Sequence, residues 1–177
     1  MKQLTVFLDI DGVLLDYSKK KPLALWADNS LEFIRFLNEQ ANIRIIWSTC
    51  WFRAFSPKKR FGIYFGKIHT TPREHFEWFF ENKGQTKYSI DPDEFYSEID
   101  KLFEKAVYIY WDYSKTELIS CLKGNNYFLF VDDGLVKREL DVLAKSNQID
   151  KWFRVDLTKK DKNLIAAKKH IENLLAV

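Results

Sequence analysis

Short apolar runs that end in polar or acidic residues recur along the chain and predict the strands of a sheet. The longest are "LTVFLD" (4–9), "IRIIWST" (43–49) and "YFLFVDD" (127–133), and two shorter ones are "AVYIYW" (106–111) and "WFRVDL" (152–157). A nearly continuous apolar run is typical of a strand that is covered on both faces, as in a parallel sheet.

Apolar residues recur with helical spacing over 30–40, 114–124 and 161–177. We expect the second of these helices to be capped by Ser114 and to stop at Gly124. Strands and helices that alternate in this way form β-α-β units. The pattern therefore predicts an α/β fold with a Rossmann-like parallel sheet and helices on both faces.

Residues 52–105 are too many for an ordinary connection between two elements, and their pattern predicts helices at 71–82 and 91–106. We interpret them as a partly helical insertion. The chain has 177 residues, with no internal repeat and no linker rich in proline, glycine or serine. A single domain over 1–177, carrying the insertion 52–105, is the expected organisation.

The composition is that of an ordinary globular protein, with 46% hydrophobic residues, 16% aromatic residues and a net charge of +3. These values indicate neither disorder nor a nucleic-acid-binding tail. The N-terminus lacks the apolar core of a signal peptide, and no apolar run reaches membrane-spanning length. We expect a cytoplasmic location, with export without a cleavable signal left open; the pattern does not fix the oligomeric state.

Candidate chemistry gathers where the predicted strands end. Asp9 and Asp11 follow the first run, Thr49 ends the second, and Asp132 and Asp133 end another. In open α/β sheets ligands bind beyond the carboxyl ends of the strands, and residues two apart on an extended segment face the same side. Four clustered carboxylates repel one another unless a cation lies between them, and oxygen ligands suit Mg²⁺.

Four motifs in order resemble those of the haloacid dehalogenase (HAD) superfamily of phosphotransferases. They are "DIDGV" (9–13), "IIWST" (45–49), Lys115 at a predicted helix start, and "FVDD" (130–133). The resemblance runs from residue 4 to about residue 136, and the strand and helix that follow also suit it. It implies a phosphatase of the HAD type.

The resemblance also implies a role for each motif residue. Asp9 corresponds to the nucleophile that forms an aspartyl-phosphate, and Asp11 to the general acid that later acts as a base toward water. Thr49 corresponds to the residue that holds a phosphate oxygen. Lys115 corresponds to the cation that neutralises the phosphoryl charge and orients Asp9.

For the cofactor, the resemblance implies Mg²⁺ bound by the carboxylates of Asp9 and Asp133 and by the backbone carbonyl of Asp11, while Asp132 supports Lys115.

Two of these assignments have competitors within the sequence. Ser48 stands next to Thr49, and the place nearer the strand end favours Thr49. Lys105 and Lys123 are alternatives to Lys115, which is favoured because it directly follows a strand and begins a helix.

The spacing of the motifs bears on the substrate. Only about 15 residues separate Gly12 from the first predicted helix, too few for a cap domain, and 52–105 lacks the strand pattern of a β-sheet cap. An open, capless site is therefore expected. By resemblance such a site acts on phosphorylated macromolecules, and we place a phosphoprotein, phosphotyrosine included, ahead of nucleic acid.

Two other functions remain open. A phosphatase of nucleotides or nucleic-acid ends is favoured by the lysine-rich segments 19–21 and 58–60, which follow two of the motifs. "WSTCW" (47–51) also resembles the surroundings of the second motif in small HAD domains of some bacterial RNA-repair proteins. The other function is a catalytically silent binding module, which gives no reason to keep four clustered carboxylates.

Overall fold

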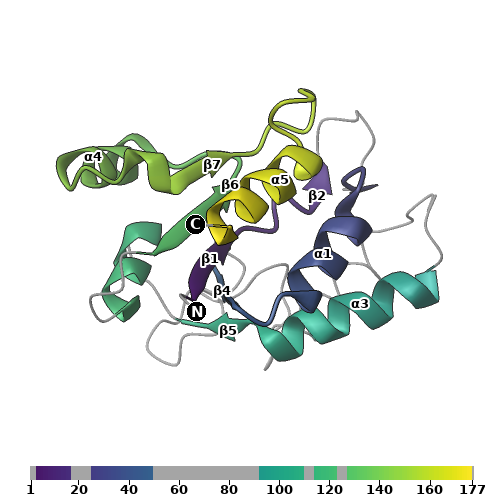
Figure 1. The fold of residues 1–177 in the computed structure, drawn as a ribbon. Helices are drawn as coiled ribbons and strands as arrows, with labels where there is room; N and C mark the ends of the chain where they lie inside the picture. Colours follow the sequence, from purple (N-terminus) through teal and green to yellow (C-terminus); the bar gives the residue numbers. More distant parts are fainter. Residues whose placement is uncertain (1–2, 17–24, 50–91, 110–113, 123–126, 177) are drawn as a thin grey trace, which may run out of the picture.

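The computed structural model describes residues 3–16, 25–49, 92–109, 114–122 and 127–176. At its centre is a five-stranded sheet in the order β5-β4-β1-β6-β7, in which every neighbouring pair is parallel (Figure 1). The strands are β1 (Leu4–Leu8), β4 (Ile43–Trp47), β5 (Val107–Tyr108), β6 (Phe128–Asp132) and β7 (Trp152–Arg154).

Strand β1 is the middle strand and sets the register of the sheet. Val6 lies opposite Ile45 of β4 on one side and Leu129 of β6 on the other. All five residues of β1 are buried, because strands cover both of its edges and helices cover both of its faces. This burial explains the nearly continuous apolar run and confirms the parallel sheet.

Helices and 3-10 turns lie on both faces of the sheet, as the sequence predicts. They are α1 (Ser30–Glu39), α3 (Pro92–Lys105), α4 (Lys137–Lys145), α5 (Leu164–Leu175), η2 (Lys115–Leu122) and η3 (Ile149–Lys151). Side chains of β1 alternate between two cores, because successive residues of a strand point to opposite faces. Val6 packs in the core that includes α1, α3 and α5, and Phe7 packs in the core that includes η2 and α4.

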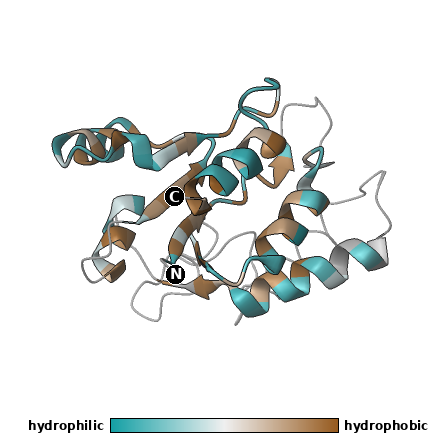
Figure 2. Cartoon of the chain, viewed as in Figure 1, coloured by the Kyte–Doolittle hydropathy of each residue, from teal (hydrophilic) through white to brown (hydrophobic). Residues whose placement is uncertain are grey.

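The ring of Phe7 anchors this second core. It stacks on Phe130 with a centroid separation of 4.6 Å and meets Phe128 edge-on at 5.8 Å. Figure 2 shows the hydrophobic strands between helices whose outer surfaces are mostly hydrophilic.

Among the described residues, no helix combines the length and apolar character needed to cross a membrane.

Several elements differ from the prediction. A two-stranded antiparallel pair, β2 (Leu15–Asp16) and β3 (Leu25–Trp26), follows β1 and was not predicted, and neither were α4 and η3. The segment after Ser114 is a 3-10 helix, closed at its start by a hydrogen bond from the Glu117 amide to the Ser114 carbonyl. Its predicted stop, Gly124, lies outside the described residues.

The insertion is described only in part. Helix α3 confirms the predicted helix at 91–106, whereas the predicted helix at 71–82 lies outside the described residues. The division of the chain into one domain with an insertion at 52–105 therefore stays a prediction.

Lys105, at the end of α3, ties that helix to the end of α1. Its Nζ donates to the carbonyl oxygens of Leu37 at 2.5 Å, Asn38 at 3.1 Å and Gln40 at 2.6 Å. The last carbonyls of a helix have no partner within the helix, and a cation there also meets the negative end of the helix dipole. Burial lowers the pKa of the Lys105 ammonium, as expected for a group that has left bulk water.

We expect Lys105→Ala to lower the free energy of unfolding by about 1–3 kcal/mol, since up to three carbonyls lose a charged donor. Lys101→Ala is the matched control, because within the described residues the exposed Lys101 makes only an ion pair with Glu98 on the same helix and should contribute about 0.5 kcal/mol or less. Urea denaturation of both variants measures the difference. Equal losses would contradict the capping role of Lys105.

Candidate active site

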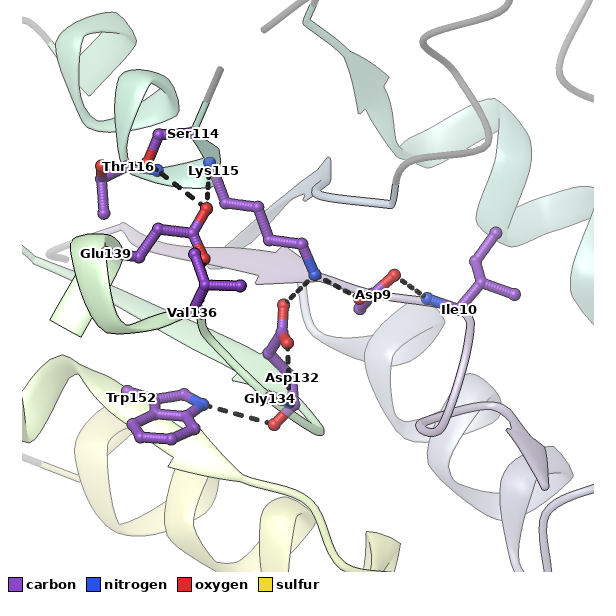
Figure 3. Close-up of polar contacts among 10 residues, drawn as sticks. All are labelled: Asp9, Ile10, Ser114, Lys115, Thr116, Asp132, Gly134, Val136, Glu139 and Trp152. Carbon is purple, nitrogen blue, oxygen red and sulfur yellow. Dashed lines mark hydrogen bonds and ion pairs between the residues drawn. The ribbon is translucent and has the colours of Figure 1, made fainter. Parts of the chain in front are cut away.

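The candidate site lies at the carboxyl ends of β1 and β6. Leu8 pairs with Val131 in the sheet, and the Asp9 amide donates to the Val131 carbonyl at 3.1 Å. This register brings Asp9, directly after β1, beside Asp132, the last residue of β6. Lys115, the first residue of η2, reaches across to both carboxylates (Figure 3).

The ammonium group of Lys115 bridges the two carboxylates. Its Nζ contacts Asp9 Oδ2 and lies 2.5 Å from Asp132 Oδ2. The second oxygen of each carboxylate accepts a main-chain hydrogen bond, from the Ile10 amide to Asp9 at 2.7 Å and from the Gly134 amide to Asp132 at 3.0 Å. Both oxygens of each aspartate are thus held, which fixes the orientation of the carboxylate planes.

Burial dominates the electrostatics of this network. Asp9 and Asp132 are 5% and 0% exposed. Burial, together with the negative charge of Asp132, raises the pKa of Asp9 to about 7, although the positive charge of Lys115 lowers it. Burial by itself would lower the pKa of Lys115, but the two carboxylates outweigh it and raise that pKa above its usual range. Lys115 therefore stays charged at neutral pH.

The structure brings together four of the six residues singled out in the sequence. Carboxylate oxygens of Asp9, Asp132 and Asp133 lie within 4.8 Å of one another, with Lys115 against the first two. The side chain of Asp11 is half-buried in the turn after β1 and is not part of this carboxylate cluster.

The second motif follows β4. Ser48 and Thr49 are both fully buried, and the Ser48 amide donates to the Leu8 carbonyl at 2.8 Å, which holds this motif beside the first. The choice of Thr49 over Ser48 as the phosphate ligand stays a prediction. Of the alternatives to Lys115, Lys105 is engaged at the end of α1, and Lys123 lies outside the described residues.

A buried glutamate that the sequence analysis did not single out also belongs to this region. Glu139, on α4, is 4% exposed and contacts the main chain of Lys115 (Figure 3). The only signal in the sequence is a glutamate three residues after the N-cap Val136, a common capping position.

One comparison with known proteins decides the family. Residues 5–170 match the model of a family described as "HAD domain in Swiss Army Knife RNA repair proteins". The chain belongs to this HAD family. The match confirms the HAD resemblance and spans all four motifs. No curated protein matches the chain.

Membership indicates a function of the hydrolase or phosphatase type, and HAD domains typically use Mg²⁺. The residues of this HAD domain fit such an ion. Three clustered carboxylates against one lysine leave a formal charge of −2, and every donor in the cluster is an oxygen. Asp133 reaches solvent, and its pKa is raised by partial burial and by the neighbouring Asp132, as expected for a carboxylate short of positive charge.

Gly12 of the HAD domain leaves room for Asp133. Its φ of +69° lies in the left-handed region, which residues with a side chain rarely adopt. A Cβ atom at this position would collide with the carboxylate of Asp133 and would lie 2.8 Å from the Asp133 Cβ. Gly134, on the other side of Asp133, has open space at the same position.

We expect Gly12→Ala to push Asp133 away and to weaken Mg²⁺ binding about tenfold or more, since the HAD resemblance implies that Asp133 binds the metal. Gly134→Ala is the matched control, because its added methyl group meets nothing. Isothermal titration calorimetry with MgCl₂ measures the affinity of both variants. Unchanged affinity in Gly12→Ala would show that Asp133 does not hold the ion.

Proposed function

We propose that this HAD domain is a Mg²⁺-dependent phosphatase. It hydrolyses phosphate monoesters at the ends of RNA through an aspartyl-phosphate on Asp9. The observation that carries the proposal is the buried network of Asp9, Lys115 and Asp132, with Asp133 beside it. The description of the matched family, which names RNA repair, supports RNA as the substrate.

The proposed reaction has two displacements at phosphorus. In the first, a carboxylate oxygen of Asp9 forms a bond to phosphorus while the bond between phosphorus and the RNA oxygen breaks, and Asp11 gives its proton to that oxygen. In the second, water attacks phosphorus, Asp11 takes a proton from the water, and the bond to Asp9 breaks to release inorganic phosphate. Splitting the reaction in this way replaces one difficult step with two easier ones.

The residues around Asp9 neutralise the negative charge of the phosphoryl group during the reaction. Lys115 neutralises charge on the phosphoryl oxygens, and Asp132 holds the ammonium in place. The hydroxyl of Thr49 donates to a phosphoryl oxygen. Asp9 and Asp133, with the Asp11 carbonyl, would hold Mg²⁺, which when bound would offset negative charge on the nucleophile and the phosphate.

A cavity of about 350 Å³ beside Asp133 offers space for the nucleoside next to the reacting phosphate. Cavities of roughly 300–1,000 Å³ are typical of small-molecule sites. Arg154, at the end of β7, is exposed on its wall and has no ion-pair partner among the described residues. A guanidinium suits the next phosphodiester of an RNA strand. The full lining is Gly12, Asp16, Asp133, Arg154, Val155, Asp156, Leu157 and Thr158.

The matched family does not favour the phosphoprotein substrate that the sequence interpretation placed first. The lysine-rich segments 19–21 and 58–60, which favoured nucleic acid, and most of 52–105 lie outside the described residues. The expectation of an open, capless site is therefore not tested by the structure.

We expect Asp9→Asn to lower turnover of a generic aryl phosphate by about a thousandfold or more, because an amide cannot act as the nucleophile. Asp141→Asn, the same change at an exposed aspartate of α4, should keep full turnover. Steady-state release of inorganic phosphate measures both. Full activity in Asp9→Asn would disprove the mechanism.

Substrate class is tested with a matched panel of RNA oligonucleotides bearing a 3′- or 5′-phosphate, phosphotyrosyl peptides and an aryl phosphate. We expect the highest kcat/KM for a phosphorylated RNA end. Arg154→Gln should raise KM for RNA by roughly tenfold and leave the aryl phosphate unchanged, since a lost charge-assisted contact of about 1.5 kcal/mol affects only the longer substrate. A phosphopeptide preference would replace RNA with protein as the substrate.

A further inference from the structure

We infer that Glu139 is a positioning residue for phosphoryl transfer: its carboxylate ties the main chain of Lys115 to the segment that follows Asp132 and Asp133. The inference rests on the proposed function. It concerns how the main chain of Lys115 is held, because Asp132, within the four motifs, supports only the ammonium group.

The two oxygens of the Glu139 carboxylate serve different segments of the chain. Oε1 accepts the main-chain amide of Lys115 at 2.6 Å and the hydroxyl of Ser114 at 3.3 Å. Oε2 accepts the main-chain amide of Val136 at 3.0 Å. Figure 3 shows the carboxylate between the start of η2 and the segment that leads into α4. One side chain therefore joins two segments more than twenty residues apart.

The burial of Glu139 exceeds what a helix cap requires. An N-terminal glutamate that bonds back to the main chain satisfies one amide and can remain in solvent. Glu139 is buried, whereas Lys137, Arg138 and Asp141 on the same helix are exposed. Within the described part of the chain its partners are two amides and a hydroxyl, with no ion pair to repay the cost of burying the carboxylate charge. Oε2 is sufficient for the cap. The hydrogen bond from the Lys115 amide to Oε1 therefore indicates a function of Glu139 beyond capping.

The hydrogen bonds of Glu139 to the Lys115 and Val136 amides, here called the tether, connect the same two segments as the ion pair between Lys115 and Asp132. Lys115 Nζ contacts Asp132 at the end of β6, and Glu139 connects the Lys115 backbone to the residues just after β6. The lysine is therefore held to one segment at both its backbone and its ammonium. A catalytic group shifted by about 1 Å can lose two orders of magnitude in rate, so fixing both ends of the lysine matters for the reaction.

Two substitutions separate the tether from the cap. In Glu139→Gln one carboxylate oxygen becomes an amide donor, which must face the amide of either Lys115 or Val136, so one connection is lost at constant size. Asn163→Ala is the matched control. It removes the side-chain cap of α5, where Asn163 Oδ1 accepts the Ala166 amide at 3.1 Å, and should cost about 1 kcal/mol of stability.

Turnover of an aryl phosphate is the first measurement, because it does not depend on RNA as the substrate. We expect Glu139→Gln to lower kcat by roughly 10- to 100-fold with a smaller change in KM, and Asn163→Ala to leave both unchanged. Combined with Lys115→Ala, Glu139→Gln should cause no further loss, since residues that act through one another are not additive. Lys115→Arg replaces Lys115→Ala in this cycle if the alanine variant is too slow to measure.

Hydrogen exchange over 114–122 is the second measurement and needs no activity. Faster exchange there in Glu139→Gln than in Asn163→Ala supports the tether, and equal exchange overturns it. Additive losses with the Lys115 variants, or an equal fall of kcat in Asn163→Ala, overturn the positioning role while the phosphatase itself stands. A wild-type protein that hydrolyses no phosphate ester overturns the proposed function and the positioning role of Glu139 together.

Discussion

The buried ammonium of Lys115 between Asp9 and Asp132 is the interaction on which the rest of the site depends. Two carboxylates at neighbouring strand ends would repel each other in a region of low dielectric, and one cation lying against both relieves that repulsion. Removing one partner from such a network leaves a buried charge uncompensated, which costs far more than the net value of the pair. The fold must therefore deliver three separate segments to one place.

The sheet places Asp9 and Asp132 side by side, because β1 and β6 are adjacent and in register. The sheet does not place Lys115, which begins a 3-10 helix beyond the strand ends. Surrounding contacts hold that helix: Leu118 packs in the core with Phe7 and Leu143, and the Glu139 carboxylate bonds the Lys115 amide. Backbone hydrogen bonds of the sheet place the carboxylates, whereas packing and side-chain hydrogen bonds place the cation.

The sequence was sufficient to predict the sheet and the clustering of Asp9 with Asp132 and Asp133, because buried parallel strands leave long apolar runs and end in line. Other features leave weaker signals. Strands β2 and β3 have two residues each, too few for an alternating pattern. Periodicity over eight residues does not separate the 3-10 helix η2 from an α-helix. Glu139 stands among charged residues and has the sequence signature of a surface position, since only tertiary structure buries it.

The central place of β1 has a consequence for the order of folding. One of its two neighbours, β6, begins only at Phe128, and Lys115, the counter-charge of Asp9, stands 106 residues after Asp9 in the chain. Pairings between distant segments are slow to form, and an unpaired apolar strand edge favours aggregation meanwhile. Asp132 thus reaches Asp9 only through the same long-range pairing that covers the second edge of β1.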